Sequence, residues 1–214
     1  MQSSKVLPRR IAAFVCTAVL STGVSSLLAA NELPQAVPGV GNFHKVDDHV
    51  YRGAQPSDEG FRNLAKLGVK TIIDLREPGE RSVAEEKAVT AAGMRYVAIP
   101  MKGMQKPTDE SIAKALDLLE DKGTGPVFVH CKRGADRTGD VIACYRVEHD
   151  QWKNAAALAE ARSLGMSWYQ KAIQHYVLSY HPRILDTAPV LAGGAVAAAA
   201  VAAVPAAAVP AIAQ

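Results

Sequence analysis

The chain has 214 residues, 49% of them hydrophobic and 21% charged, which is enough for one globular domain with a buried core and additional tails. All 21 acidic residues follow residue 30 and three basic residues precede it, so the net charge of +3 belongs to the N-terminus and the rest of the chain is neutral. A neutral domain lacks the basic face that nucleic-acid binding requires, and no nucleic-acid partner is expected.

The first 30 residues predict a secretory signal peptide. Lys5, Arg9 and Arg10 precede an uncharged stretch, 11–30, that ends in small residues. Export through such a leader would place the protein in the periplasm or outside the cell. Because the apolar stretch is long, a retained N-terminal membrane anchor is the alternative interpretation.

Residues 31–42 are rich in proline and glycine and predict a linker, so we place the globular domain at 43–187. Within the domain, β-branched runs alternate with amphipathic segments. The runs predict strands, and these lie at 43–46, 50–52, 69–75, 94–99 and 126–130. Two of the segments between them begin with residues that cap helices well, Ser57 and Thr108, and a further helix is expected from about Arg81 to Ala92.

The C-terminal part of the domain, after Arg137, is helical in pattern almost to residue 185. Breaks at 151–154 and 165–167 divide it into three helices. Strands that alternate with helices of about ten or more residues predict an α/β fold, with a mostly parallel central sheet flanked by helices on both faces.

An alanine-rich, low-complexity tail follows the domain at 188–214. It holds no charged residue from Val190 to Gln214, and Pro205 and Pro210 interrupt it. These prolines favour a disordered tail over a membrane-spanning segment. We therefore expect membrane contact only through an uncleaved leader or this tail, and we expect a monomer.

Three cysteines are too few for a disulfide framework. Cys16 lies in the leader. Cys144 is expected about two turns into the helix that begins near Arg137, which is too far from Cys131 for a disulfide bond. The position of Cys144 is typical of a small, buried apolar residue.

The segment 127–139 is the most informative part of the sequence, because it runs from a strand through a short loop into a helix. A loop of this length directs backbone N–H groups inward, and the helix N-terminus adds partial positive charge. Together they form a cradle for an anion such as phosphate. The same field, with Arg137, should lower the pKa of Cys131 below its ordinary value of about 8.5 and make the thiolate available as a nucleophile.

The other residues of this segment have roles that fit the same chemistry. Arg137 has a planar guanidinium group that can hold two phosphate oxygens. Gly134 permits a close approach of the backbone, and the Thr138 hydroxyl can hydrogen-bond to the sulfur as it departs. We expect His130 to order the loop rather than to titrate during catalysis.

The pattern His130-Cys131-x5-Arg137-Thr138-Gly139 resembles the signature loop of the cysteine-based protein tyrosine and dual-specificity phosphatases. The sequences YRGAQP at 51–56 and DLR at 74–76 are similar to those of bacterial dual-specificity-like phosphatases, and the likeness covers about residues 43–180. It implies the cysteine-phosphatase fold and a metal-free hydrolysis in two steps through a phosphocysteine. We expect no cofactor and no metal site, because no histidines and carboxylates are spaced along the sequence as metal ligands.

The general acid of this reaction is not fixed by the sequence. Family members usually carry an aspartate on the loop that here spans 100–107, but this loop has none before Asp109. Asp109 could instead be an acidic residue in the first turn of the helix capped by Thr108. Asp136, inside the signature loop, resembles the proposed acid of myotubularin-type and some bacterial lipid-directed phosphatases, or it could hold the loop by accepting hydrogen bonds.

The substrate is expected to be a phosphorylated protein, lipid or inositol. His130, Lys132, Arg133, Gly134 and Ala135 are the loop positions expected to contact it. Lys132 and Arg133 resemble loops that act on phosphoinositides or inositol polyphosphates, although both could be solvent-facing charges. A catalytically weak phosphate-binding module of the same fold is the alternative function, and intact Cys131 and Arg137 count against it.

Overall fold

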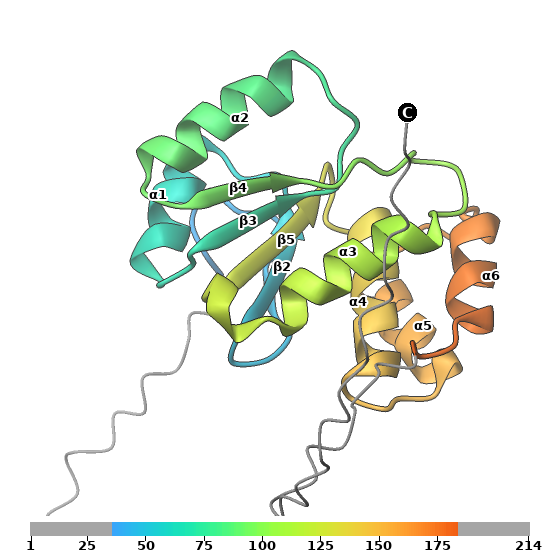
Figure 1. Ribbon diagram of the computed structural model, residues 1–214. Coiled ribbons are helices and arrows are strands. Elements are labelled where there is room, and N and C mark those ends of the chain that lie inside the picture. Colours follow the sequence, from blue (N-terminus) through green and yellow to red (C-terminus); the bar gives the residue numbers. More distant parts are fainter. Residues whose placement is uncertain (1–35, 184–214) are drawn as a thin grey trace, which may run out of the picture.

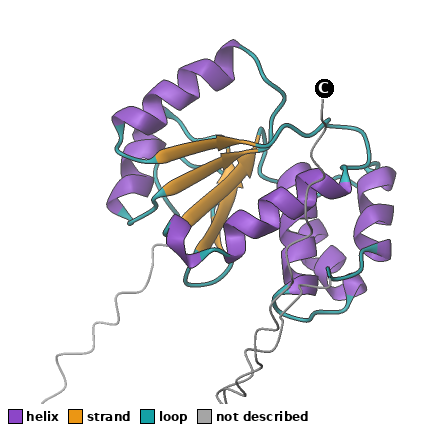
Figure 2. Ribbon diagram, in the orientation of Figure 1, coloured by secondary structure: helices purple, strands orange, loops and turns teal. Residues whose placement is uncertain are grey.

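The computed structural model describes residues 36–183, which form a sheet with helices on both faces (Figures 1 and 2). The strands of this region are β1 His44–Lys45, β2 Val50–Ala54, β3 Thr71–Asp74, β4 Arg95–Ala98 and β5 Val127–Cys131. The helices are α1 Asp58–Lys66, α2 Glu80–Ala91, α3 Asp109–Glu120, the short 3-10 helix η1 Lys122–Thr124, α4 Asp136–Glu148, α5 Asn154–Ser163 and α6 Lys171–Ser179.

The five strands lie in the order β1-β2-β5-β3-β4. Three of the four pairings are parallel, and only the short β1 runs antiparallel, to β2. The last strand in sequence, β5, therefore lies at the centre of the sheet, where its five residues are all buried. This arrangement confirms the predicted mostly parallel α/β fold, and it brings Cys131, at the end of β5, to the carboxyl edge of the sheet.

The helices divide between the two faces of the sheet, as Figure 1 shows. Helices α1 and α2 cover one face, where Phe61 and Val89 pack with Ile72 and Phe128 of the sheet. Helices α3 to α6 cover the other face and supply most of the larger core. Burial of this apolar surface on both sides is what stabilises the parallel strands.

The predicted helix starts agree with the capping contacts. The Ser57 hydroxyl accepts a hydrogen bond from the Gly60 N–H at 3.2 Å, and the Thr108 hydroxyl accepts one from the Ser111 N–H at 3.1 Å. Each bond satisfies one of the N–H groups that a first helical turn leaves without an internal partner.

The ordered domain begins earlier than the sequence indicated. Val37 and Val40, which fall in the predicted linker 31–42, are buried in the core beside α1, and Gly39 accepts a hydrogen bond from the Ser57 N–H. Gly39 has φ of 82°, a conformation that glycine adopts readily. It also lacks a side chain, which allows this turn to pack closely against the start of α1. Proline and glycine therefore mark a packed turn here rather than a flexible linker.

Several predicted features lie outside the described residues. These are the signal peptide at 1–30, the first part of the linker, the end of the domain at 184–187 and the alanine-rich tail at 188–214. Within residues 36–183, none of the helices combines the length and the apolarity that crossing a membrane requires.

Candidate active site

The predicted signature loop lies between the central strand and α4, as expected. Cys131 is the last residue of β5, and α4 begins at Asp136 without a side chain that caps its first turn. The first turn thus has no side-chain cap, and N–H groups at such a helix start are the donors that an anion cradle needs. Arg137, in the first turn, extends its Nη1 toward the carbonyl oxygens of Leu75 at 3.4 Å and Met101 at 3.2 Å.

Cys131 is almost fully buried, yet its pKa lies below the ordinary value. Burial opposes ionisation, but the nearby hydroxyl and N–H of Thr138, the positive charge of Arg137 and the Arg133 N–H stabilise the charged form and outweigh it. The structure thus brings together the thiol, the hydroxyl and the guanidinium that the sequence predicted. Cys144, by contrast, is buried in α4, and burial raises the pKa of its thiol.

Gly134 lets the loop pack directly on strand β2. Its φ is 66°, and a Cβ at this position would lie 2.2 Å from the backbone carbonyl carbon of Gly53. The Gly134 carbonyl oxygen accepts a hydrogen bond of 2.8 Å from Nη2 of Arg52, a fully buried side chain of β2. Glycine is therefore required here by both conformation and space.

Arg52 is a site residue that the chemical analysis of the sequence missed. Burial lowers its pKa to about 10, so the guanidinium remains charged at neutral pH. It lies under the loop, near enough for its charge and that of Cys131 to influence each other. The sequence signal that could have identified Arg52 is a charged residue inside a strand expected to be buried, since an arginine is rarely fully buried without a specific partner.

Asp136 holds the loop in place through both of its carboxylate oxygens. Oδ1 accepts a hydrogen bond of 2.7 Å from the Ser167 N–H, and Oδ2 accepts one from Nη2 of Arg133, which also donates to the Ser167 hydroxyl. These hydrogen bonds outweigh the effect of burial and lower the pKa of Asp136. The contacts match the loop-holding role, and they join Arg133 to the segment between α5 and α6.

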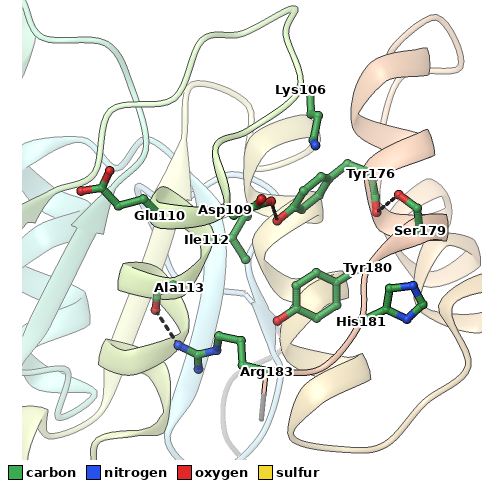
Figure 3. A pocket seen from close by; sticks show the side chains of 10 residues that line it. All are labelled: Lys106, Asp109, Glu110, Ile112, Ala113, Tyr176, Ser179, Tyr180, His181 and Arg183. Atoms are coloured by element: carbon green, nitrogen blue, oxygen red, sulfur yellow. Dashed lines mark hydrogen bonds between the residues drawn. The ribbon is translucent and has the colours of Figure 1, made fainter. Parts of the chain in front are cut away.

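Asp109 lies in a pocket away from the signature loop (Figure 3). Its Oδ1 accepts a hydrogen bond of 3.0 Å from the Tyr176 hydroxyl, and it occupies the first turn of α3, capped by Thr108. This pocket, of about 520 Å³, contains no residue of the signature loop and is lined by Lys106, Asp109, Glu110, Ile112, Ala113, Tyr176, Ser179, Tyr180, His181 and Arg183. Asp109 thus lies where the helix-start role, the alternative interpretation, would place it.

A groove of about 390 Å³ leads to Arg137 from the other side of the loop. It is lined by Gln55, Arg76, Glu77, Gly79, Glu80, Arg81, Ser82, Lys132 and Arg137. Lys132 therefore faces the groove beside Arg137, whereas Arg133 is bound to Asp136. The residues from the start of α2 and the loop before it were not identified from the sequence as part of the site.

A buried network of charged side chains supports the loop from the α2 side of the sheet. Nη2 of Arg76 lies 2.6 Å from both Oδ2 of Asp74 and Oε2 of Glu85, and the second Glu85 oxygen lies 2.7 Å from Nε2 of His130. The Tyr96 hydroxyl also donates to Asp74, at 2.8 Å. His130, expected to order the loop, is thus tied to α2.

This network brings together three side chains with metal-ligating groups, although the sequence spacing showed no such cluster. The ligand atoms of Asp74, Glu85 and His130 lie within 4.8 Å of one another. They come from β3, α2 and β5, so only the fold unites them. Arg76 already forms ion pairs with both carboxylates, and we assign the cluster to an ion-pair network.

The fold and this loop define a class. A parallel sheet whose central strand ends in a cysteine, followed by an anion cradle and an arginine in the first helical turn, is the arrangement of the cysteine-dependent phosphatases. Comparison with protein families agrees: the model described as DSP-PTPase phosphatase fused to NAD+ kinase matches residues 40–175. The chain belongs to this family of dual-specificity phosphatase domains, which confirms the resemblance inferred from the signature loop.

Similar proteins span several named activities. The inositol diphosphatase DSP3 of Arabidopsis thaliana is 30% identical over 135 residues, or 61% of this chain and 66% of that protein. The dual specificity protein phosphatase TpbA of Pseudomonas aeruginosa strain UCBPP-PA14 is 30% identical over 131 residues, or 61% of this chain and 58% of that protein. The matches thus span about two thirds or less of these relatives' length.

A solved structure shows the same fold. The core catalytic domain of the PP-IP phosphatase SIW14 from S. cerevisiae, in complex with citrate, has a TM-score of 0.59 and 25% sequence identity. The match covers 68% of this chain and 89% of that domain.

Proposed function

We propose that the protein hydrolyses phosphate esters through a phosphocysteine formed on Cys131. The observation that carries this proposal is the position of Cys131, a buried thiol at the end of the central strand β5 that faces Arg137 and Thr138 in the first turn of α4, groups that lower its pKa. Burial alone would keep a thiol protonated, so the surrounding groups stabilise its charged form. A thiolate held within an anion cradle is arranged to attack phosphorus.

The reaction then has two steps. In the first, the Cys131 sulfur bonds to phosphorus while the bond from phosphorus to the leaving oxygen breaks, and the leaving oxygen takes up a proton. In the second, water attacks phosphorus, the sulfur–phosphorus bond breaks, and phosphate is released with a proton. Arg137 and the loop N–H groups stabilise the phosphoryl oxygens in both steps, and Thr138 stabilises the sulfur as it leaves.

Neither predicted aspartate is arranged as the proton donor. Asp136 accepts hydrogen bonds at both oxygens and has a lowered pKa, which favours its charged form, and Asp109 is bound to Tyr176 in another pocket. We therefore propose that Asp136 positions the loop. Leaving groups that need little protonation, such as phosphate itself in a phosphoanhydride, are then the ones best suited to this site.

We propose a substrate that carries more than one phosphate or other anionic group. Lys132 and Arg81 line the groove beside Arg137 and would add positive charge where a second anionic group of the substrate would lie. Phosphorylated inositols and lipid headgroups are compounds of this kind. The named activities of the plant relative, an inositol diphosphatase, and of the yeast domain, a PP-IP phosphatase, support the proposal.

We propose that hydrolysis takes place outside the cytoplasm, in the periplasm or beyond the cell. This rests on the signal-peptide pattern of residues 1–30, which lie outside the described part of the chain. Sequencing the N-terminus of protein recovered from the cell envelope would test it. A mature chain that still begins at Met1 would contradict cleavage.

The decisive experiment measures hydrolysis of a series of aryl phosphates with different leaving-group pKa values. Cys131→Ser should abolish activity, and the parent should release one equivalent of phenol in a burst if the phosphocysteine accumulates. A parent protein that binds phosphate without hydrolysing any of these esters would contradict the enzyme and support a binding module.

The same series separates a proton donor from a positioning residue. Loss of a general acid slows esters of poor leaving groups much more than esters of good ones, because only the former need protonation. We expect Asp136→Asn to slow all esters by similar factors and Asp109→Asn to have little effect. A selective loss with poor leaving groups in either variant would identify that aspartate as the acid.

A further inference from the structure

Two surface segments beside the signature loop expose large apolar side chains. Met104 is 65% exposed, Trp168 76% and Tyr169 48%, although their neighbours Met101, Met166 and Gln170 are buried. We call the segments 102–106 and 168–171 together the rim. Isolated exposed apolar residues are ordinary, but three in adjacent segments at the edge of a functional site indicate a contact surface.

The two segments of the rim are joined to each other and to the signature loop. Nε2 of Gln170 donates to the Gly103 carbonyl oxygen at 2.7 Å and lies 3.3 Å from the Met104 sulfur. Ser167, which immediately precedes the rim, contacts both Asp136 and Arg133. The exposed side chains are therefore held at a fixed position relative to Cys131.

The charge of the rim is wholly positive. It contains Lys102, Lys106 and Lys171, all exposed, and no acidic residue. The Lys171 ammonium lies 5.9 Å from the centre of the Trp168 ring, so basic and aromatic groups share one surface. The described chain from 161 to 183 also has no acidic residue. Positive charge and exposed apolar groups therefore occur together in the rim.

We propose that the rim binds the surface of an anionic lipid bilayer, which would bring phosphorylated headgroups close to the site of Cys131. Tryptophan and tyrosine favour the interface between headgroups and acyl chains, and adjacent lysines attract anionic lipids. A phosphopeptide would need complementary acidic residues for the lysines and one defined apolar pocket, whereas the exposed rings and lysines suit a laterally fluid surface. This adds a membrane contact besides those predicted for the leader and the tail.

The two tryptophans of the chain make this proposal directly testable. Trp168 is in the rim, whereas Trp152 follows the opposite end of α4 and packs against Arg146, with 4.7 Å between the guanidinium carbon and the ring centre. Trp152→Phe leaves Trp168 as the only reporter, and Trp168→Phe leaves Trp152. The fluorescence of each variant reports only the surroundings of its one tryptophan. Membrane contact through the leader or the tail therefore does not by itself change the Trp168 signal relative to that of Trp152.

The experiment adds vesicles of phosphatidylcholine, with or without phosphatidylglycerol, to each full-length variant, and compares quenching by brominated acyl chains. We expect a blue shift and strong quenching of Trp168 with anionic vesicles, weakened by salt, and little change of Trp152. Lys171→Ala should reduce the vesicle affinity reported by Trp168 about fivefold, the effect of one lysine near an anionic surface.

Two outcomes would overturn the proposal. Trp168 that is quenched no more than Trp152 would show that the rim does not enter the interface. Trp168 that responds to a phosphotyrosyl peptide but not to vesicles would assign the rim to a protein substrate. Neither outcome concerns hydrolysis, since the fluorescence measurement needs no turnover, so failure of the rim proposal leaves the phosphatase proposal intact.

Discussion

The site has two regions that differ in how they are built. Below Cys131 lies a floor of buried side chains: Arg52 donates to the Gly134 carbonyl oxygen, Arg76, Glu85 and His130 form a charged network, and Thr138 lies in the first turn of α4. Above it lies a mouth of exposed or partly exposed groups, which includes Lys132 and Arg81. In the proposed function, the floor holds the thiolate and the shape of the cradle, whereas the mouth contacts the substrate. Substitutions in the two regions should therefore have different signatures.

Arg137 lies between floor and mouth and should give the largest effect on catalysis. Arg137→Lys keeps the charge but loses the planar fork that holds two phosphoryl oxygens, so we expect kcat with an aryl phosphate to fall by about 100-fold or more. Arg95→Lys, at an exposed position at the start of β4, is the matched control and should leave kcat unchanged. A fall of less than about threefold in Arg137→Lys would mean that charge alone is sufficient.

Glu85 tests the floor through stability. Glu85→Gln removes one charge from a buried group of ion pairs, so that Arg76 keeps only Asp74 and the carboxylate beside His130 is lost, which should lower the free energy of unfolding by about 3 kcal/mol. Glu86→Gln, on the exposed side of α2, is the control and should change it by less than about 0.5 kcal/mol. Urea unfolding measures both, and equal effects would show that the network contributes little.

The part of the site that lies in one continuous segment could be predicted from the sequence. Residues 127–139 pass from strand to loop to helix, so the order of residues alone indicates that Cys131, Arg137 and Thr138 face one anion. The helix caps at Ser57 and Thr108 were predictable for the same reason, because capping depends on neighbours in the chain.

Most of the floor could not be predicted in this way, because three of its residues come from separate elements. Arg52 is on β2, Arg76 follows β3 and Glu85 is on α2, and nothing in their local sequences shows that Arg76 meets Glu85 or that Arg52 lies under the loop. The surroundings of Asp109 could not be predicted for the same reason. Its neighbours in sequence are compatible with both a catalytic loop and a helix start, whereas its hydrogen-bond partner Tyr176 comes from α6.

Thr138 tests how the floor controls the reactivity of Cys131. The folded protein lowers the pKa of Cys131, so the thiolate should persist, and react with iodoacetamide, at pH values below those typical of a free cysteine. Thr138→Ala removes the hydroxyl that helps to stabilise the thiolate, and the alkylation profile should move upward by about one pH unit.

Cys144 is the internal reference for this measurement. Burial raises the pKa of its thiol, so it should remain unmodified over the same pH range, and peptide mass spectrometry distinguishes the two sites. A profile of Cys131 that does not move in Thr138→Ala would assign the low pKa to Arg137 and the loop N–H groups alone.

The smallest effects should come from Lys132 and Arg133, adjacent residues that lie in different surroundings. Lys132 lines the groove, so Lys132→Ala should raise the KM for a substrate with several phosphates about fivefold, with less effect at high salt and no change in unfolding. Arg133 instead binds Asp136 and Ser167, so Arg133→Ala should lower the free energy of unfolding by about 1 kcal/mol. If the two substitutions had the same effects on KM and on unfolding, Arg133 would belong to the mouth together with Lys132. Its contacts with Asp136 and Ser167 would then contribute little to stability.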